Sequence, residues 1–407
     1  MSQDFYSVPN LRFKNYSEEW KKYKVSDLLK TYPTNSLSWE QLSYENVSKL
    51  KDIHYGLIHN GFETTCINLD NKLIPYISSE SYPKNYEILQ IGDLILADAS
   101  ENREDVGRPI EIVNINNQDT ISGLHTIHAR NKTNLIENGF KGFYFQSHAM
   151  KNQIYKIANG SKIYGMSPTN FNELFMCIPC KSEQRKIIFV LSKLEEMIQT
   201  QIKIIEDYVI LKNSLINRFF TMDNPKVKLS TILTEINIKN KNKQIDTVLS
   251  VSNKLGFIKQ SEQFEDREVA SDDTSNYKIV NKGDYAYNPA RINVGSIARL
   301  INYDKGIISP MYSCFKINEK KITYTYFDMF LSSSSFKRQL NKKLEGSVRQ
   351  CLTFEGLVSM DIELPCIETQ KSISNKIDML SYKIKLESDY REALINQKQF
   401  LLNNMFI

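Results

Sequence analysis

Two residue pairs have the spacing of metal or redox sites, namely Cys177 with Cys180 and His125 with His128. A Cys-x-x-Cys pair can bind zinc or form a disulfide, but four-coordinate zinc needs further ligands, and the neighbouring sequence supplies none. The cysteine pair is therefore expected to be buried and structural. The two histidines fall in the run Thr120–Arg130, which resembles a strand. Residues three apart on a strand face opposite sides, so a shared metal is not expected.

Nucleotide hydrolysis and methyl transfer also lack their usual motifs. No Gly-x-Gly-x-x-Gly loop and no Walker-type phosphate loop occurs in the sequence. The segment Asn288-Pro289-Ala290-Arg291 is close to the Asn-Pro-Pro-Tyr motif of amino-methyltransferases. Ala and Arg replace the second Pro and the aromatic ring that would stack on the target base. A stand-alone N6-adenine DNA methyltransferase is therefore kept only as an alternative function.

Composition places the chain among soluble proteins with more than one domain. It has 407 residues, of which 41% are hydrophobic and 24% charged. Six cysteines without framework spacing, no long apolar run and no signal-peptide pattern predict a cytoplasmic protein with no membrane contact. The net charge of +5 permits contact with a phosphate backbone but does not require it.

The elements that must position any functional residue occur twice in the sequence. Gln184 and Gln370 are equivalent, and the same difference in residue number relates several other pairs without a gap. These pairs are Gly160-Ser161 with Gly346-Ser347, Pro179-Cys180 with Pro365-Cys366, Lys212 with Lys398, and Asn217 with Asn403. A chain that repeats a whole domain is suited to a partner that itself has two parts.

Each copy ends in a predicted long helix. From Ser182 to Phe220 there is no Gly or Pro, and apolar residues recur at alternating steps of three and four. They are Ile187, Leu191, Leu194, Ile198, Ile202 and Ile205, and in the second copy Ile373, Ile377, Leu380, Ile384, Leu394 and Leu401. We expect the two helices to pair within the chain as an antiparallel coiled coil, with a dimer between two chains as the alternative. Glu387 and Arg391 interrupt the second stripe, which predicts looser packing or polar pairs there.

The globular parts are predicted to be α+β. Short β-rich runs such as Gly92–Leu96 and Gly142–Phe145 are separated by Gly, Asn and Asp. The predicted architecture is two pseudo-symmetric globular domains, each followed by one of the long helices. The expected boundaries are 1–180 for the first globular domain, 181–223 for its helix, 224–366 for the second globular domain and 367–407 for its helix.

Several short motifs, taken in their order and spacing, resemble type I restriction-modification specificity subunits. They are Val8-Pro9-Asn10-Leu11-Arg12-Phe13 with Glu18-Glu19-Trp20, the segment Asn288–Gly295, the helix starts Pro179–Gln184 and Pro365–Gln370, and the helix ends Asn217–Phe220 and Asn403–Phe406. Their order, spacing and duplication extend over nearly the whole chain. The resemblance implies two target-recognition domains, each of which reads one half of a split double-stranded DNA sequence. The helix pair would fix the gap between the halves.

The same resemblance implies that the chain has no catalytic site, cofactor or metal of its own. Two methyltransferase subunits that use S-adenosylmethionine, and restriction subunits that use ATP with Mg²⁺ to translocate, would dock on the long helices. A coiled-coil scaffold with duplicated binding domains and no DNA role is the second alternative.

Sequence readout requires side chains that reach base edges, with Arg matched to guanine and Asn to adenine, while Lys and Ser hold phosphates. The candidates in the second domain are Arg291, Asn293 and Ser296 in a loop, and Lys337, Arg338, Lys342 and Lys343 on a predicted helix. The candidates in the first domain are Asn102, Arg103, Arg108 and Arg130, with Lys151 and Lys156 at the positions that match Lys337 and Lys342. For each of them, a solvated surface charge is the alternative.

Overall fold

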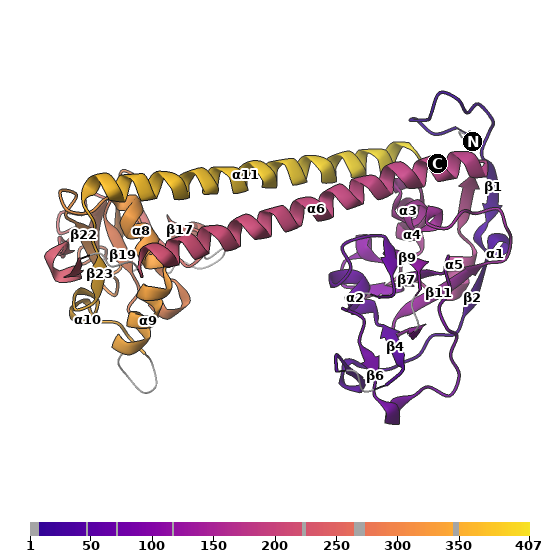
Figure 1. Cartoon of the computed structure of the whole chain (residues 1–407), viewed down its shortest axis with the longest axis horizontal. Coiled ribbons are helices and arrows are strands. Elements are labelled where there is room, and N and C mark those ends of the chain that lie inside the picture. Colours follow the sequence, from indigo (N-terminus) through magenta and orange to yellow (C-terminus); the bar gives the residue numbers. More distant parts are fainter. Residues whose placement is uncertain are drawn as a thin grey trace. The chain divides into compact units, whose positions relative to one another are not determined.

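The computed structural model describes residues 8–45, 48–70, 72–115, 118–221, 225–263, 273–344 and 350–407 (Figure 1). The repeat pair Gly346-Ser347 lies outside these residues. The chain forms two compact units. The first contains Met1–Lys203 and Ser388–Ile407, and the second contains Ile204–Glu387. Each unit therefore includes one globular region and parts of both long helices.

The two predicted long helices are confirmed as α6 (Lys181–Phe219) and α11 (Ile367–Asn404), which lie side by side in Figure 1. In the first unit, Leu194 and Ile198 of α6 form an apolar cluster with Leu394 of α11. The start of α6 therefore packs against the end of α11. No helix in the described part of the chain is both long and apolar enough to cross a membrane.

The second unit shows the reverse contact. Ile216, near the end of α6, shares a hydrophobic core with Ile373 and Ile377 at the start of α11. The helix pair is therefore antiparallel, as the sequence predicted. Glu387, which interrupts the apolar stripe of α11, forms an ion pair with Lys383 one turn earlier.

The first unit is built on two main sheets. One has the strand order β2 (Leu29–Tyr32), β11 (Thr126–Asn131), β7 (Leu94–Ala97), β9 (Pro109–Asn114) and β5 (Cys66–Asn68). The other has the order β10 (Asp119–Ser122), β4 (Leu50–Ile53), β6 (Tyr76–Ile77) and β3 (Leu42–Ser43). Two further pairs are β1 (Lys21–Lys24) with β13 (Phe175–Ile178), and β8 (Ala99–Ser100) with β12 (Tyr164–Gly165). The helical segments are α1 (Val25–Leu28), α2 (Tyr55–Asn60), α3 (Phe140–Gln146), α4 (His148–Ile157), α5 (Pro168–Asn172), η1 (Trp39–Gln41), η2 (Ser79–Ser81) and η3 (Arg103–Asp105).

The second unit repeats this plan with fewer described strands. One sheet has the order β15 (Leu233–Ile236), β22 (Ser313–Ile317), β19 (Tyr285–Tyr287) and β20 (Ile297–Arg299). The other has the order β17 (Gly256–Lys259), β16 (Val248–Ser252), β21 (Lys305–Ile308) and β18 (Lys278–Asn281), and β14 (Lys226–Lys228) pairs with β23 (Asp361–Glu363). The helical segments are α7 (Gln260–Gln263), α8 (Tyr324–Ser332), α9 (Ser334–Lys343), α10 (Phe354–Val358), η4 (Leu229–Thr231) and η5 (Ile292–Val294).

The two units share their turn chemistry as well as their topology. In each, a Gly with positive φ precedes a buried Asp that starts a central strand: Gly92 with Asp93, and Gly283 with Asp284. The Asp carboxylate accepts a hydrogen bond from the backbone three residues earlier, at 2.8 Å in the first unit and 2.7 Å in the second. The repeated Gly-Asp motif therefore has a structural role, since Gly supplies the left-handed conformation and Asp closes the turn.

The residues that follow each long helix are anchored in the same way. Phe406 packs on Phe140 and Tyr144 in the first unit, with ring centroids 5.8 and 5.5 Å apart. Phe220 packs on the equivalent rings of the second unit, those of Tyr326 and Phe330, at 5.1 and 5.5 Å. Every one of these rings is buried. The end of α11 thus belongs to the core of the first unit, and the end of α6 to that of the second.

Two predictions about the first globular region are wrong. Gly142–Phe145 lies in helix α3 and not in a strand, because this stretch is buried on all sides and has no alternation of polar residues. The run Thr120–Arg130 is not one strand, since β10 and β11 are separated by a turn in which His125 adopts a φ of 54°. Fully buried apolar runs do not distinguish helix from strand by periodicity.

Candidate nucleic-acid interface

Each long helix is attached to its globular region through one buried glutamine. The side-chain Oε1 of Gln184 accepts a hydrogen bond from Glu137 N at 2.8 Å, and its Nε2 donates to two backbone carbonyls, both at 2.9 Å. Gln370 repeats this arrangement with Thr323 N at 2.9 Å and two carbonyls at 2.9 Å. Both side chains are fully buried. The glutamine of the sequence motif thus fixes where each helix begins relative to its own module.

A second glutamine pair, at equivalent positions of the repeat, holds the two helices that carry lysine candidates. Gln153 of α4 exchanges two hydrogen bonds with the backbone of Phe175, each at 3.0 Å. Gln339 of α9 exchanges two with the backbone of Asp361, each at 2.8 Å. These contacts lock α4 against β13 and α9 against β23. The faces of the two helices that remain in solvent are therefore set by the scaffold.

The solvent-facing sides of α4 and α9 carry the predicted phosphate-binding residues. Lys151 and Lys156 of α4 are exposed. On α9 the exposed set is larger and comprises Lys337, Arg338, Lys342 and Lys343. Met150 and Ile154 lie on the buried side of α4, and Phe336 and Leu340 on that of α9. The helices are amphipathic, with cations free to meet a phosphate backbone, and α9 carries the greater charge.

The loop that follows β19 presents two of the three base-reading candidates of the second unit. Its ends are joined by a hydrogen bond from Asn288 N to Ser296 O at 3.0 Å, and Gly295 adopts a φ of 91°. Arg291 and Asn293 are exposed. Ser296 is buried, and its hydroxyl donates to Val251 O at 3.0 Å, so its polar group is used inside the unit.

Arg291 stands at the edge of a cavity of about 280 Å³. Its lining is mostly polar and includes Ser250, Ser252 and Asn288, with Tyr277 and Tyr312 as the aromatic members. The arginine can donate to the edges of bases, and the amide and hydroxyl groups beside it can both donate and accept. This cavity is therefore suited to hydrogen-bonded readout.

The corresponding loop of the first unit, after β7, holds three candidates. Asn102 is exposed and caps η3, accepting a hydrogen bond from Glu104 N at 3.3 Å. Arg103 stacks on Tyr155, with its guanidinium 4.2 Å from the ring centroid. Arg108 donates to the carbonyl oxygens of His59 at 2.8 Å and Phe62 at 3.4 Å. Arg108 is thus tied to the frame, whereas Asn102 remains accessible.

Asn102 and Arg108 line a cavity of about 670 Å³ in the first unit. The walls of this cavity include Trp39, Tyr55 and His125. Of these three residues, the sequence drew attention only to His125, and there only as half of a possible metal pair. They come from three separate segments of the chain, and no motif marks them, so only the fold brings them together.

His54 lies beneath this aromatic wall and is buried. Its Nδ1 accepts a hydrogen bond from Gly56 N at 3.2 Å and so caps α2. Burial, and to a lesser extent the nearby His125, lower the pKa of His54 to about 4. The ring is therefore neutral at pH 7, as its acceptor role requires.

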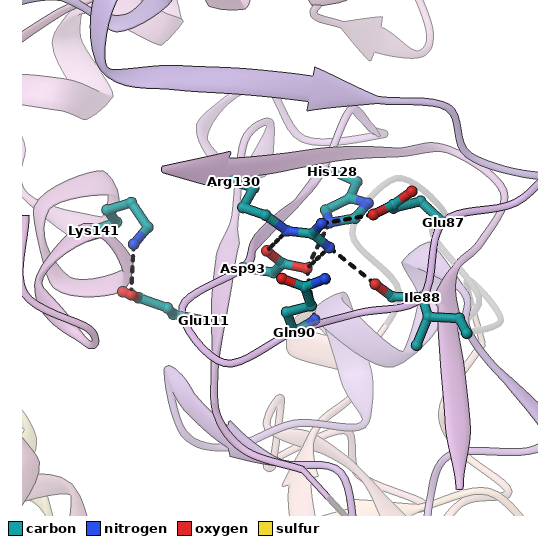
Figure 2. A network of polar contacts seen from close by, with 8 residues as sticks. All are labelled: Glu87, Ile88, Gln90, Asp93, Glu111, His128, Arg130 and Lys141. Atoms are coloured by element: carbon teal, nitrogen blue, oxygen red, sulfur yellow. Dashed lines mark hydrogen bonds and ion pairs between the residues drawn. The ribbon is translucent and has the colours of Figure 1, made fainter. Parts of the chain in front are cut away.

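Arg130 occupies a network of charges inside the first unit (Figure 2). It donates to Asp93 at 2.7 and 2.8 Å, to Glu87 at 2.6 Å and to Ile88 O at 2.9 Å. His128 Nε2 lies 2.8 Å from the same carboxylate. Burial alone would raise the pKa of Asp93, but hydrogen bonds from Arg130 and His128 outweigh it and lower the pKa. These internal contacts account for Arg130 without DNA.

A second buried charge pair joins Glu111 of β9 to the start of α3 (Figure 2). Lys141 Nζ donates to Glu111 at 2.9 Å, and both side chains are fully buried. The same carboxylate accepts hydrogen bonds from Gly139 N and Gly142 N, each at 2.7 Å. Glu111 thus satisfies N–H groups at the helix start as well as the ammonium charge.

The thiol and histidine pairs do not form sites in this structure. Cys177 is half-buried, but Cys180 is exposed, so the expectation that both would be buried is wrong for Cys180. It stands at the last position before α6. Among the residues with defined placement, no group of three His, Cys, Asp or Glu could hold a metal.

No family model matches the sequence, and no curated protein matches it. Solved structures do match over nearly the full length. The S subunit of the type I restriction-modification system from M. genitalium is similar with a TM-score of 0.54 at 12% identity, covering 98% of this chain and 99% of that one. A chain from a structure that describes complex assembly and conformational transition of the type I restriction-modification system gives 0.60 at 14% identity, covering 94% and 96%. The chain therefore has the fold of type I restriction-modification specificity subunits, as its motifs implied.

Proposed function

We propose that this chain is a DNA sequence-specificity subunit of a type I restriction-modification complex, with no catalytic site of its own. Each globular module reads one half of a split double-stranded target, and the helix pair fixes the number of unread base pairs between the halves. Catalysis then belongs to partner subunits, which are two methyltransferase subunits that use S-adenosylmethionine and restriction subunits that use ATP and Mg²⁺.

One observation carries the proposal. The contacts that join helix to module are the same at equivalent positions of the repeat, as for Gln184 and Gln370, while the cavities differ in size and chemistry. A common frame with two different cavities is what two different half-sites require. Within each unit the reading loop accompanies a basic helix, which supports base contact and phosphate contact from one module.

Among the predicted contacts, we retain Asn102, Arg103, Arg291 and Asn293 for base edges. The exposed cations of α4 and α9 are retained for phosphates. Arg108, Arg130 and Ser296 hold internal hydrogen bonds, and we propose that they support the reading loops and sheets without contacting bases.

Partner docking is supported by apolar surface on the long helices. Phe189 of α6 is 64% exposed, and Met379 and Tyr382 of α11 are 72% and 65% exposed. Large apolar side chains in solvent on a helix that already has one covered face mark a surface for a further protein. We propose that these faces bind the methyltransferase subunits.

The experiment is selection of bound duplexes from a randomised library by the full chain together with its methyltransferase partner. The expected result is enrichment of two short blocks of defined sequence separated by a gap of constant length and free sequence. Enrichment of one continuous block, or of no sequence at all, would contradict the proposal. The partner alone is the control and should enrich neither block.

A further inference from the structure

The cavity of the first unit is larger than base-edge hydrogen bonding requires. Its volume is about 670 Å³, against about 280 Å³ for the cavity beside the reading loop of the second unit. The larger value falls in the range of cavities that enclose a whole small molecule. The cavity therefore has room for a whole base and not only for its edge.

The wall of this cavity is formed by aromatic and imidazole rings that pack against one another. Trp39 is 43% exposed, and its ring centroid lies 4.5 Å from that of the buried His54. Tyr55 lies 4.6 Å from His54 on one side and 5.3 Å from His125 on the other. A Cβ added at Gly56 would stand 3.2 Å from the Trp39 ring, so this glycine lets the indole lie against α2. The indole is thus fixed while part of its surface stays open.

His125 is held in an unfavourable backbone conformation at the same wall. Its φ of 54° is in the left-handed region, which residues with a side chain rarely adopt. Its Nδ1 lies 3.3 Å from Asp98 Oδ1, which orients the ring. Strained residues persist where the surrounding structure holds them for a purpose, and here the result is a further ring at the cavity.

Polar groups that match base edges lie around the rings. Asn60, Asn102 and Asp105 also line the cavity, and Asn60 and Asn102 are exposed. Amides can both donate and accept, and a carboxylate accepts from amino groups of bases. Rings for stacking with such groups beside them are the features by which proteins hold a base that has left the helix stack.

We propose that the cavity lined by Trp39, Tyr55 and His125 binds one base of the first half-site outside the DNA stack, with the base stacked on Trp39. The proposal rests on the proposed DNA-reading function and deepens it. The second unit, with its small polar cavity, reads its half-site with the bases stacked. The two modules therefore differ in mode of recognition as well as in sequence.

The test uses the complex of the full chain with its methyltransferase partner and the duplex obtained by selection. Each base of the first half-site in turn is placed opposite an abasic residue, which removes the pairing that extrusion must break. At one position other than the adenine that the partner methylates, this change should tighten binding several-fold, because a base without a partner leaves the stack at lower cost. In the second half-site the same change should tighten binding only at the methylated adenine, which the methyltransferase itself takes out of the stack.

Variants of the exposed ring decide the assignment. Trp39→Ala should weaken cognate binding by about 5–150-fold, the loss expected for one base–aromatic stack, and should remove the abasic effect. Trp39→Phe should retain most of both. Tyr44→Ala is the matched control, because Tyr44 is an exposed aromatic residue of the same unit, at 63%, outside the cavity.

Three results would overturn the inference. The first is that no abasic position of the first half-site, apart from that of the methylated adenine, tightens binding although the cognate duplex binds, which leaves the DNA-reading function standing. The second is that deoxynucleoside monophosphates quench Trp39 emission to saturation while Trp39→Ala leaves DNA binding unchanged, which assigns the cavity to a free nucleotide. The third is that selection with the complex enriches no duplex, in which case the proposed function fails as well.

Discussion

The two units of this chain have one scaffold and two different interiors. In the numbering of the repeat, Lys141 corresponds to Phe327, and both side chains are fully buried. The first unit thus has a charged pair where the second has an aromatic ring packed between Tyr285 and Phe330. The residues that stay the same, such as Gln184 and Gln370, are those that attach each module to a long helix. The attachment of each module to its helix is therefore kept while the interior of the module differs.

The difference extends to how each unit stabilises polar groups. The first unit buries Asp93 with His128 and Arg130, whereas the second pairs Arg299 with Asp328 at 2.9 Å in a more exposed setting. Buried charges are costly to leave without their partners, so the first unit is the more sensitive to single substitutions inside its sheets. Variants of the two units test this contrast directly.

The largest effect is expected at the buried ion pair of the first unit. Lys141→Met leaves the Glu111 carboxylate without its counter-charge and should lower the stability of this unit by about 3–5 kcal/mol. Hydrogen exchange of amides in the first unit measures the change. Lys151→Met, on the exposed face of α4, is the control and should change little. An equally small effect of Lys141→Met would show that the buried pair is not needed.

The next effect is a change in how stability depends on pH. Asp52 is buried in β4, and burial raises its pKa to about 7, against a partly opposing hydrogen bond from Asn35. Between about pH 4 and pH 7 the Asp52 carboxyl keeps its proton in the folded state but has lost it in the unfolded state. Stability therefore falls as pH rises through this window, by roughly 3–4 kcal/mol.

Asp52→Asn should remove this loss, so the variant is expected to be more stable than the natural chain at pH 8 and similar to it at pH 4. The lowered pKa of His54 acts in the opposite direction, since its stabilisation is present above about pH 6.5 and is lost as pH falls toward 4. The stability of the variant should thus rise between pH 4 and pH 6.5. Unfolding by denaturant across this range measures both slopes, and parallel curves for the two proteins would refute the assignment.

Gln184 and Gln370 attach each long helix to its module through the same hydrogen bonds. Replacing either glutamine is therefore expected to lower the stability of its own unit by a similar amount. Gln184→Ala leaves the half-buried Glu137 N–H without an acceptor, and Gln370→Ala does the same to the half-buried Thr323 N–H. Each should destabilise its own unit by about 2–3 kcal/mol. Local hydrogen exchange distinguishes the units. A large effect in one and none in the other would show that the two joints are not equivalent.

A smaller effect is expected for base reading in the second unit. Arg291→Ala should weaken binding to the selected duplex by about 1–3 kcal/mol and relax the requirement at one base position of one half-site. Competition between the selected duplex and single-base variants of it measures this. Equal losses on selected and scrambled DNA would assign Arg291 to the phosphate backbone.

The smallest effect concerns phosphate contacts. Lys342→Ala on α9 should weaken binding to all sequences alike and reduce the slope of log K against log salt concentration by about 1. Lys156→Ala on α4 is the equivalent change in the first unit and should act in the same way. Discrimination between half-site sequences should be unaffected in both. A sequence-dependent loss would place either lysine at a base.

The parts of the fold that follow local rules were predictable from sequence. The helices α6 and α11 have long apolar stripes without Gly or Pro, and the repeat fixed their pairing within one chain. Helix α3 was missed, because its sequence is buried all round and carries no periodic signal. The Trp39 cavity was missed for another reason. Its rings lie on separate segments, and neither spacing nor composition connects Trp39 with His125 before the chain is folded.

Some residues of the candidate interface could likewise be predicted from the sequence, and others could not. Exposed cations on α4 and α9 could be identified, because a helix with one apolar face must show the other to solvent. The buried role of Arg130 could not, because its partners Asp93 and Glu87 lie far from it in the chain and only the fold brings them together. An arginine on a strand has the same sequence pattern whether it reads a base or closes an internal network.

Mapping methylated adenines in cells decides whether the two modules read two halves of one target. Three kinds of cell are compared: cells with the natural chain, cells without it, and cells with substitutions confined to the loop Asn288–Ser296. We expect a split methylated motif that vanishes with the chain and that changes in one half only when the loop is altered. The same methylation pattern in all three kinds of cell would show that the chain does not read the target.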